Sequence, residues 1–212
     1  MSQESTDSTR SEAQASEESF DREKDLANLR NVAGIHFAMV TGALTLWGAA
    51  DLWAETSGWA LAYAAAIANA VLAGVVVANT SHEWGHFAGA RLSGAASPVM
   101  DKPVRYFFMF NFPFERTDRR QFAWMSWGGI VAPWLLVLLT LLLIPIDTVG
   151  RALLLAVFVT RAVQVSVFEV PVVLRARQGG DPREELGRQL VSGFGTSRYA
   201  GLAAGALVWL AV

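Results

Sequence analysis

The sequence contains no cysteine and only three histidines, His36, His82 and His86. Without thiols the chain has no disulfide framework, no thiolate metal site and no cysteine nucleophile. Three imidazoles are also too few for a histidine-box oxygenase, which uses many more ligands. Any metal chemistry in this chain must therefore come from a few imidazoles combined with carboxylates.

Charge is scarce as well. Only 17% of the 212 residues are charged, 53% are hydrophobic, and the formal net charge is −2. So little net charge gives no indication of a nucleic-acid partner. The hydrophobic residues lie in long runs, which is typical of a protein embedded in a lipid bilayer. We therefore expect a disordered polar tail over residues 1–31 and one membrane-embedded domain over residues 32–212. Within the tail, Phe20–Arg30 is either a plain linker or one or two turns of interfacial helix.

The long apolar runs predict an all-α polytopic membrane protein with four to five transmembrane helices. A bilayer core is crossed by about 20 apolar residues in helical conformation. The last run is shorter than that, and it is open whether it forms a short or re-entrant helix or part of a further span. The runs are Val32–Trp53, Trp59–Leu92, Trp124–Ile146, Ala152–Leu174 and the short Tyr199–Val212.

The basic residues predict the orientation of these spans. If four spans alternate, every lysine and arginine except Arg151 and Arg161 falls in segments on one side of the membrane. The loops on the other side carry Asp51, Glu55 and Asp147. Because basic residues favour the cytoplasmic side, the N-terminus is expected there. We expect an integral protein of a bacterial or archaeal inner membrane.

The second apolar run contains the pentapeptide H-E-W-G-H, from His82 to His86, and Glu83 is the only charged side chain in residues 58–90. Two histidines four residues apart share one face of a helix and can bind one metal ion. The glutamate between them can reach a metal-bound water. Because such groups are costly within a membrane, the motif predicts a zinc site with Glu83 as general base.

Residues 78–94, ANTSHEWGHFAGARLSG, resemble the site-2 protease family of intramembrane zinc metalloproteases. That family has H-E-x-G-H-F-x-x-A-R at the cytoplasmic end of a transmembrane helix, and Phe87, Ala90 and Arg91 extend the match. Its later Gly-Pro-x-x-Asn signature has only a loose counterpart here, in residues 128–134, which lack the asparagine. The resemblance implies an intramembrane peptidase whose third zinc ligand is an aspartate.

The third ligand is not evident from the motif, and three residues are candidates. Asp181, between Gly180 and Pro182, looks most like the aspartate of the family. Depth favours Glu169, which lies about 9 Å inside the end of its span, while the two motif histidines lie about 8–14 Å inside theirs. Asp181 is expected in water as a helix N-cap. His36 lies at a similar depth and is the third candidate.

The aromatic segment at residues 104–114, VRYFFMFNFPF, is too short to cross a membrane as a helix. Its aromatic residues favour a strand, so it predicts a small membrane-associated β element, or else an interfacial anchor. As a strand it could hold an extended substrate along its edge.

These features together predict a zinc-dependent endopeptidase that cleaves transmembrane or membrane-proximal segments of membrane proteins near the cytoplasmic face. The predicted site consists of the ligands His82, His86 and Glu169, the catalytic Glu83 and one Zn²⁺. One alternative is an inactive homologue that binds membrane proteins without cleaving them. Another is a membrane-anchored peptidase that pairs H-E-x-x-H with a downstream glutamate, which Glu169 would suit.

Overall fold

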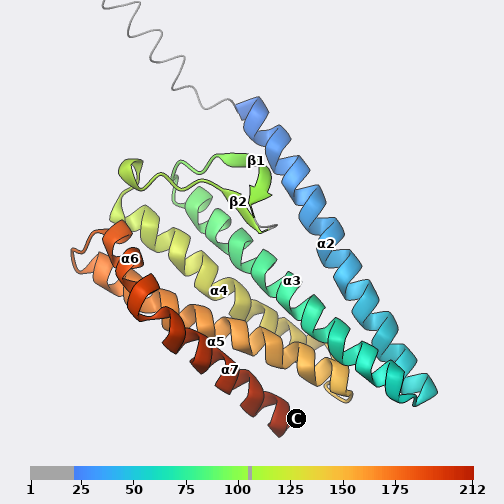
Figure 1. Cartoon of the computed structure of the whole chain (residues 1–212). Coiled ribbons are helices and arrows are strands. Elements are labelled where there is room, and N and C mark those ends of the chain that lie inside the picture. The colour runs from blue at the N-terminus through green and yellow to red at the C-terminus, as the bar shows by residue number, and fades with distance from the viewer. Residues whose placement is uncertain (1–21, 105–106) are drawn as a thin grey trace, which may run out of the picture.

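The computed structural model describes residues 22–104 and 107–212, and within them the chain is mostly helical with one small antiparallel sheet (Figure 1). The predicted class, an all-α polytopic membrane protein with a small β element, is confirmed. The helices are α2 (Arg22–Ser57), α3 (Ala60–Leu92), α4 (Arg119–Leu143), α5 (Val149–Arg177), α6 (Pro182–Ser192) and α7 (Phe194–Ala211), the strands are β1 (Val99–Val104) and β2 (Phe108–Phe110), and a short 3₁₀ turn covers Phe114–Arg116.

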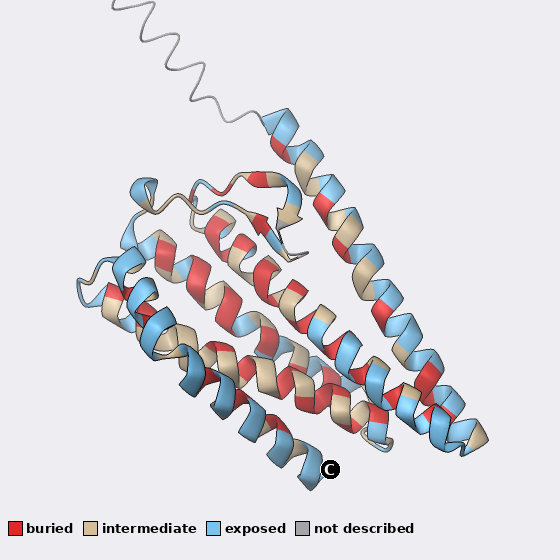
Figure 2. Ribbon diagram, viewed as in Figure 1, coloured by how far each residue is buried: buried red, intermediate tan, exposed pale blue. Residues whose placement is uncertain are grey.

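Helices α2 to α5 are long and apolar enough to cross a membrane, by length and composition, so the chain is an integral membrane protein. Their buried residues face the interior of the bundle, and their outer faces are exposed (Figure 2). Phe37, Leu61 and Leu142 are each 68–72% exposed, as expected for side chains that face lipid. Helices α2 and α5 extend beyond their predicted runs at both ends, and α4 begins five residues before its run, because polar residues at these ends continue the helices. Helix α3 matches its predicted run to within one residue.

The core of the bundle lies between α3, α4 and α5. Helix α2 packs against α3 on one side, and α7 packs against α5 on the other (Figure 1). The largest cluster of buried side chains joins Val77 of α3, Val137 of α4, and Leu155 and Phe158 of α5. These three helices therefore form the frame that positions the polar groups described below.

Helix α7 packs closely on α5 through small residues. Ser197, Gly201 and Gly205 are its buried residues, and they recur every four positions on one face. A Cβ added at Gly201 would come within 2.5 Å of the Thr160 carbonyl oxygen on α5. The last apolar run is thus an 18-residue helix that starts at Phe194 instead of Tyr199.

The start of α2 corrects the predicted tail. The helix begins at Arg22, so the prediction of disorder is wrong for residues 22–31, whereas residues 1–21 lie outside the described part of the chain. Tertiary bonds hold this polar stretch in place. Asp25 forms an ion pair with Arg91 at 2.7 Å and accepts a hydrogen bond from the Val99 amide at 2.9 Å. Composition alone does not reveal these partners.

The β element also differs from its predicted bounds of residues 104–114. It begins earlier, at Val99, and its second strand ends at Phe110. The sequence of β1, VMDKPV, contains Asp, Lys and Pro, which are poor strand formers, so its pattern gave no strand signal. Strand β1 is held by β2 and by α2, where Asn28 donates hydrogen bonds to the Val99 carbonyl and the Asp101 carboxylate.

A candidate metal centre

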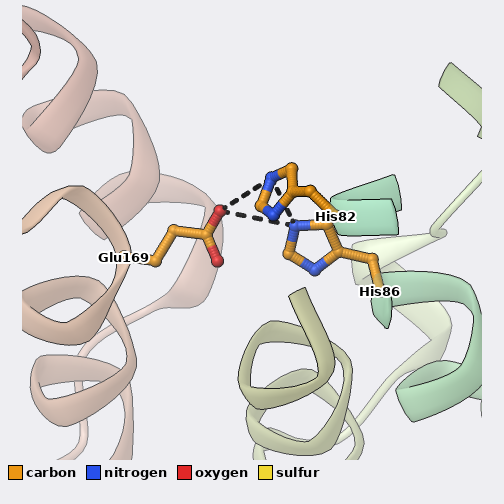
Figure 3. Close-up of side chains that lie close together, drawn as sticks. All are labelled: His82, His86 and Glu169. Carbon is orange, nitrogen blue, oxygen red and sulfur yellow. Dashed lines mark hydrogen bonds and ion pairs between the residues drawn. The ribbon is translucent and has the colours of Figure 1, made fainter. Parts of the chain in front are cut away.

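Two helices of the core bring three metal-binding side chains together. His82 and His86 lie on α3, Glu169 lies on α5, and their tips converge (Figure 3). Glu169 Oε1 is 3.3 Å from His82 Nε2 and 3.3 Å from His86 Nε2, and the two Nε2 atoms are 3.2 Å apart. The three predicted ligands therefore form a group that could hold a metal ion.

Hydrogen bonds to α4 fix the orientation of both imidazoles. His82 Nδ1 lies 2.9 Å from the Gly129 carbonyl oxygen, and His86 Nδ1 lies 2.9 Å from the Met125 carbonyl oxygen. A carbonyl oxygen can only accept, so both Nδ1 atoms carry the proton and donate. In the neutral imidazole each Nε2 is then an unprotonated acceptor, which is the form that binds a metal.

This arrangement aims three acceptor atoms at one point. Both Nε2 lone pairs and Glu169 Oε1 lie within 3.3 Å of one another, and acceptors this close repel unless a positive charge lies between them. The other oxygen, Glu169 Oε2, is buried and has no hydrogen-bond partner among the described residues. A buried carboxylate left in this state is costly, and a bound cation would satisfy both oxygens.

A proline explains why a helix carbonyl is available to His82. In an α-helix the Gly129 carbonyl would accept from the amide of residue 133, but that residue is Pro133, which has no amide hydrogen. The carbonyl is therefore free to accept from the His82 ring. Gly129 also leaves room for His86, because a Cβ at this position would overlap the His86 ring.

Glycines let α3 and α4 approach until their backbones touch. A Cβ at Gly85 would overlap the Gly128 carbonyl, and a Cβ at Gly89 would overlap the Trp124 carbonyl. Gly85, the glycine of the H-E-W-G-H motif, therefore lies directly against α4. This contact brings the imidazoles within reach of the α4 carbonyls, so the glycines and the histidines on α3 act together.

The metal-binding group lies in a cavity of about 560 Å³ whose lining is mostly apolar. Glu83 is 7% exposed and lines the same cavity. Two polar side chains of α5, Arg161 and Gln164, line it too. Aromatic side chains that follow the start of β2 form much of its wall, namely Phe108, Phe110, Phe112 and Phe114.

The two other candidates for the third ligand lie elsewhere. Asp181 is the N-cap of α6, where its carboxylate accepts from the amides of Arg183 and Glu184 and Pro182 follows as the first helical residue. Its predicted role as a cap is confirmed. His36, on α2, is 2% exposed, and its Nδ1 accepts a hydrogen bond from Trp84 Nε1 at 3.1 Å. Neither residue belongs to the metal-binding group.

Sequence reasoning missed the residues of α4 that support the histidines. Met125 and Gly129 act through backbone carbonyls, which no sequence motif marks. One signal was present, because a proline inside an apolar helix frees the carbonyl four residues earlier, and Pro133 stands four residues after Gly129. In the sequence, this stretch otherwise stands out only as a loose counterpart of the Gly-Pro-x-x-Asn signature.

No protein-family model, curated protein or solved structure matches this chain. The grounds for its function are therefore the site itself and the motif that begins at His82.

Proposed function

We propose that the chain is a zinc-dependent intramembrane endopeptidase that cleaves transmembrane or membrane-proximal segments of other membrane proteins. The observation that carries the proposal is the triangle of ligand atoms from His82, His86 and Glu169, set inside a membrane bundle beside a buried glutamate. Within the described residues, Glu83 is placed on the cavity wall together with these three side chains.

The donor set and its dimensions support zinc. Zinc binds imidazole nitrogen and carboxylate oxygen at about 2.0–2.1 Å in tetrahedral geometry, which separates neighbouring ligand atoms by about 3.3 Å. The observed separations of 3.2, 3.3 and 3.3 Å match one face of such a tetrahedron. Magnesium and calcium prefer oxygen ligands in larger number, so two imidazoles argue against them.

The expected chemistry is hydrolysis of a peptide bond. A zinc ion held by His82, His86 and Glu169 would supply a coordinated water with its pKa lowered to about 7 and would polarise a carbonyl. Glu83 would act as the general base that takes the proton this water gives up as the water oxygen bonds to the carbonyl carbon. Glu83 would then pass that proton to the amide nitrogen as the C–N bond breaks. The two α4 carbonyls keep both imidazoles in the tautomer that leaves Nε2 free.

The lining of the cavity is suited to an extended apolar substrate. A helical substrate hides its carbonyls in its own hydrogen bonds, so the scissile segment must unwind before cleavage. Strand β2 pairs with β1 on one side only within the described sheet, and Phe108 and Phe110 of β2 line the cavity. Its other edge could bind an extended segment beside the metal-binding group. Cleavage near the cytoplasmic face follows if the basic end of the bundle is cytoplasmic.

The test compares wild type with Glu83→Gln in liposomes that contain a reporter protein with one transmembrane segment. We expect both proteins to bind about one zinc per chain and only wild type to cleave the reporter. A folded wild-type chain that binds zinc and the reporter without cleaving it would support the inactive binding module instead. Equal cleavage of a soluble peptide and of the membrane reporter would favour the alternative of a membrane-anchored peptidase that pairs H-E-x-x-H with a downstream glutamate.

A further inference from the structure

A second concave site lies between the start of α4 and the end of α5. Its volume is about 560 Å³, and it shares no lining residue with the cavity at the metal-binding group. Three arginines, two tryptophans and one alanine line this cleft: Arg119, Arg120, Ala123, Trp124, Trp127 and Arg177.

The cleft is strongly basic and has no acidic lining residue. Arg119 donates a hydrogen bond to the Gly179 carbonyl at 2.9 Å, which leaves its charge unbalanced. Arg120 and Arg177 are exposed, and neither forms an ion pair with an acidic residue in the described part of the chain. Three positive charges around one cleft repel one another, and an anion bound among them would relieve that repulsion.

The cleft continues along α4 as an apolar surface. Counting 100° per residue, Arg120, Trp124 and Trp127 share a helix face with Val131, Leu135 and Leu138, over about five turns. Val131, Leu135 and Leu138 are 47–50% exposed, and Trp124 is 49% exposed. Tryptophan is enriched at the level of lipid headgroups, with aliphatic residues beyond it towards the bilayer centre.

We propose that this cleft binds the headgroup phosphate of an anionic phospholipid, whose acyl chains lie along the apolar face of α4. The arginines supply the charge and hydrogen-bond donors that a phosphate requires. The stripe from Trp124 to Leu138 distinguishes a lipid from free phosphate, because free phosphate would make no use of it. A lipid held here contacts the two helices that carry Gly129 and Glu169, at the same end of the bundle as the metal-binding group. The inference does not depend on the proposed peptidase function.

The test uses the full chain in nanodiscs of phosphatidylcholine with increasing amounts of phosphatidylglycerol, and measures retained lipid by native mass spectrometry. The double variant Arg120→Gln/Arg177→Gln is expected to bind phosphatidylglycerol at least 10-fold more weakly than wild type. The matched control is Arg22→Gln/Arg198→Gln, which removes two exposed arginines from the starts of α2 and α7. This control is expected to bind within about two-fold of wild type, as removal of general surface charge should act weakly.

Two results would overturn the proposal. An equal loss in both double variants would mean that the lipid responds only to overall charge. Displacement of phosphatidylglycerol by inorganic phosphate at equal concentration would mean that the cleft recognises a free anion and makes no use of the apolar stripe. Because the substituted arginines are exposed, folding should be unaffected, and Arg120→Lys/Arg177→Lys, which keeps the charge, should retain most of the binding.

Discussion

Each end of the bundle holds a cluster of ionisable groups around a buried carboxylate, but only one cluster has a partner for every group. At the end opposite the metal-binding group, Arg151 forms ion pairs with Asp51 at 3.0 Å, with Glu55 at 3.1 Å and with Asp147. Thr148 donates to the other oxygen of Asp51 at 2.8 Å. Both carboxylate oxygens of the buried Asp51 thus have a donor. Charges of both signs are present, and this cluster ties α2 to α5 without any ligand.

At the other end, the cluster of His82, His86 and Glu169 presents only acceptors to its centre when both imidazoles are neutral. Both imidazoles have already used their donor hydrogens on α4, and one oxygen of Glu169 has no partner among the described residues. The match between donors and acceptors therefore distinguishes structural from ligand-binding polar clusters within a membrane bundle. A cluster with matched donors and acceptors stabilises the fold, whereas converging acceptors indicate a bound cation.

Substitution of either motif histidine should have the largest effect on zinc affinity, because each supplies a ligand atom. His82→Ala or His86→Ala should weaken zinc binding by more than about 100-fold, beyond what is typical for loss of supporting groups. Competition with a zinc chelator measures the change. His36→Gln is the control, since His36 bonds Trp84 and lies outside the group, and an equal loss in this variant would point to unfolding.

Glu169 is expected to contribute to zinc binding, and Asp181 is not. Glu169→Gln should weaken binding by about 10-fold or more, because it removes the negative ligand. Asp181→Asn should leave zinc affinity unchanged, since asparagine is also a good N-cap and the helix should lose at most about 1 kcal/mol. Titration of both variants with zinc shows which of the two carboxylates is the ligand. The reverse ranking would show that the glycine-flanked aspartate is the ligand and that α6 is placed differently when metal is bound.

Pro133→Ala tests whether the proline frees the carbonyl that orients His82. The alanine amide would compete for the Gly129 carbonyl, and zinc affinity should fall by up to about 10-fold. Helix stability should rise or stay the same, because alanine is the better helix former. Zinc titration and thermal unfolding of the same sample separate these effects. Val131→Ala, on the lipid-facing side of the same helix, is the control and should change neither zinc affinity nor thermal stability. Unchanged zinc affinity in Pro133→Ala would show that the proline does not help to orient His82.

Arg151→Gln should leave zinc affinity unchanged and lower the stability of the fold. It leaves the buried Asp51 without its charged partner, and because Arg151 is partly exposed the cost is expected to be about 1–3 kcal/mol. Thermal unfolding measures the loss, and zinc titration supplies the contrast with the histidine variants. A large fall in zinc affinity without a change in stability would contradict the structural role given to this end of the bundle.

The parts of this structure that a single physical rule governs could be predicted from the sequence. Long apolar runs identify membrane helices because the bilayer sets their length. Helix geometry places His82 and His86 on one face because they are four residues apart. Glu169 could be predicted as the third ligand because it lies at a similar depth in its own span. The polar start of α2 and strand β1 could not be predicted, because bonds between distant segments stabilise them against weak local preferences. The α4 carbonyls were not predicted because any residue can supply one.

The most direct test of the central claim is X-ray absorption at the zinc edge on the purified full chain, combined with elemental analysis. We expect about one zinc per chain, bound to nitrogen and oxygen at about 2.0–2.1 Å, with two imidazoles in the ligand shell of wild type. Glu83→Gln should give the same protein ligands, and His86→Ala should lose the signal. A folded chain that binds no zinc, or a spectrum without imidazole ligands, would contradict the claim that these three acceptors share a metal ion.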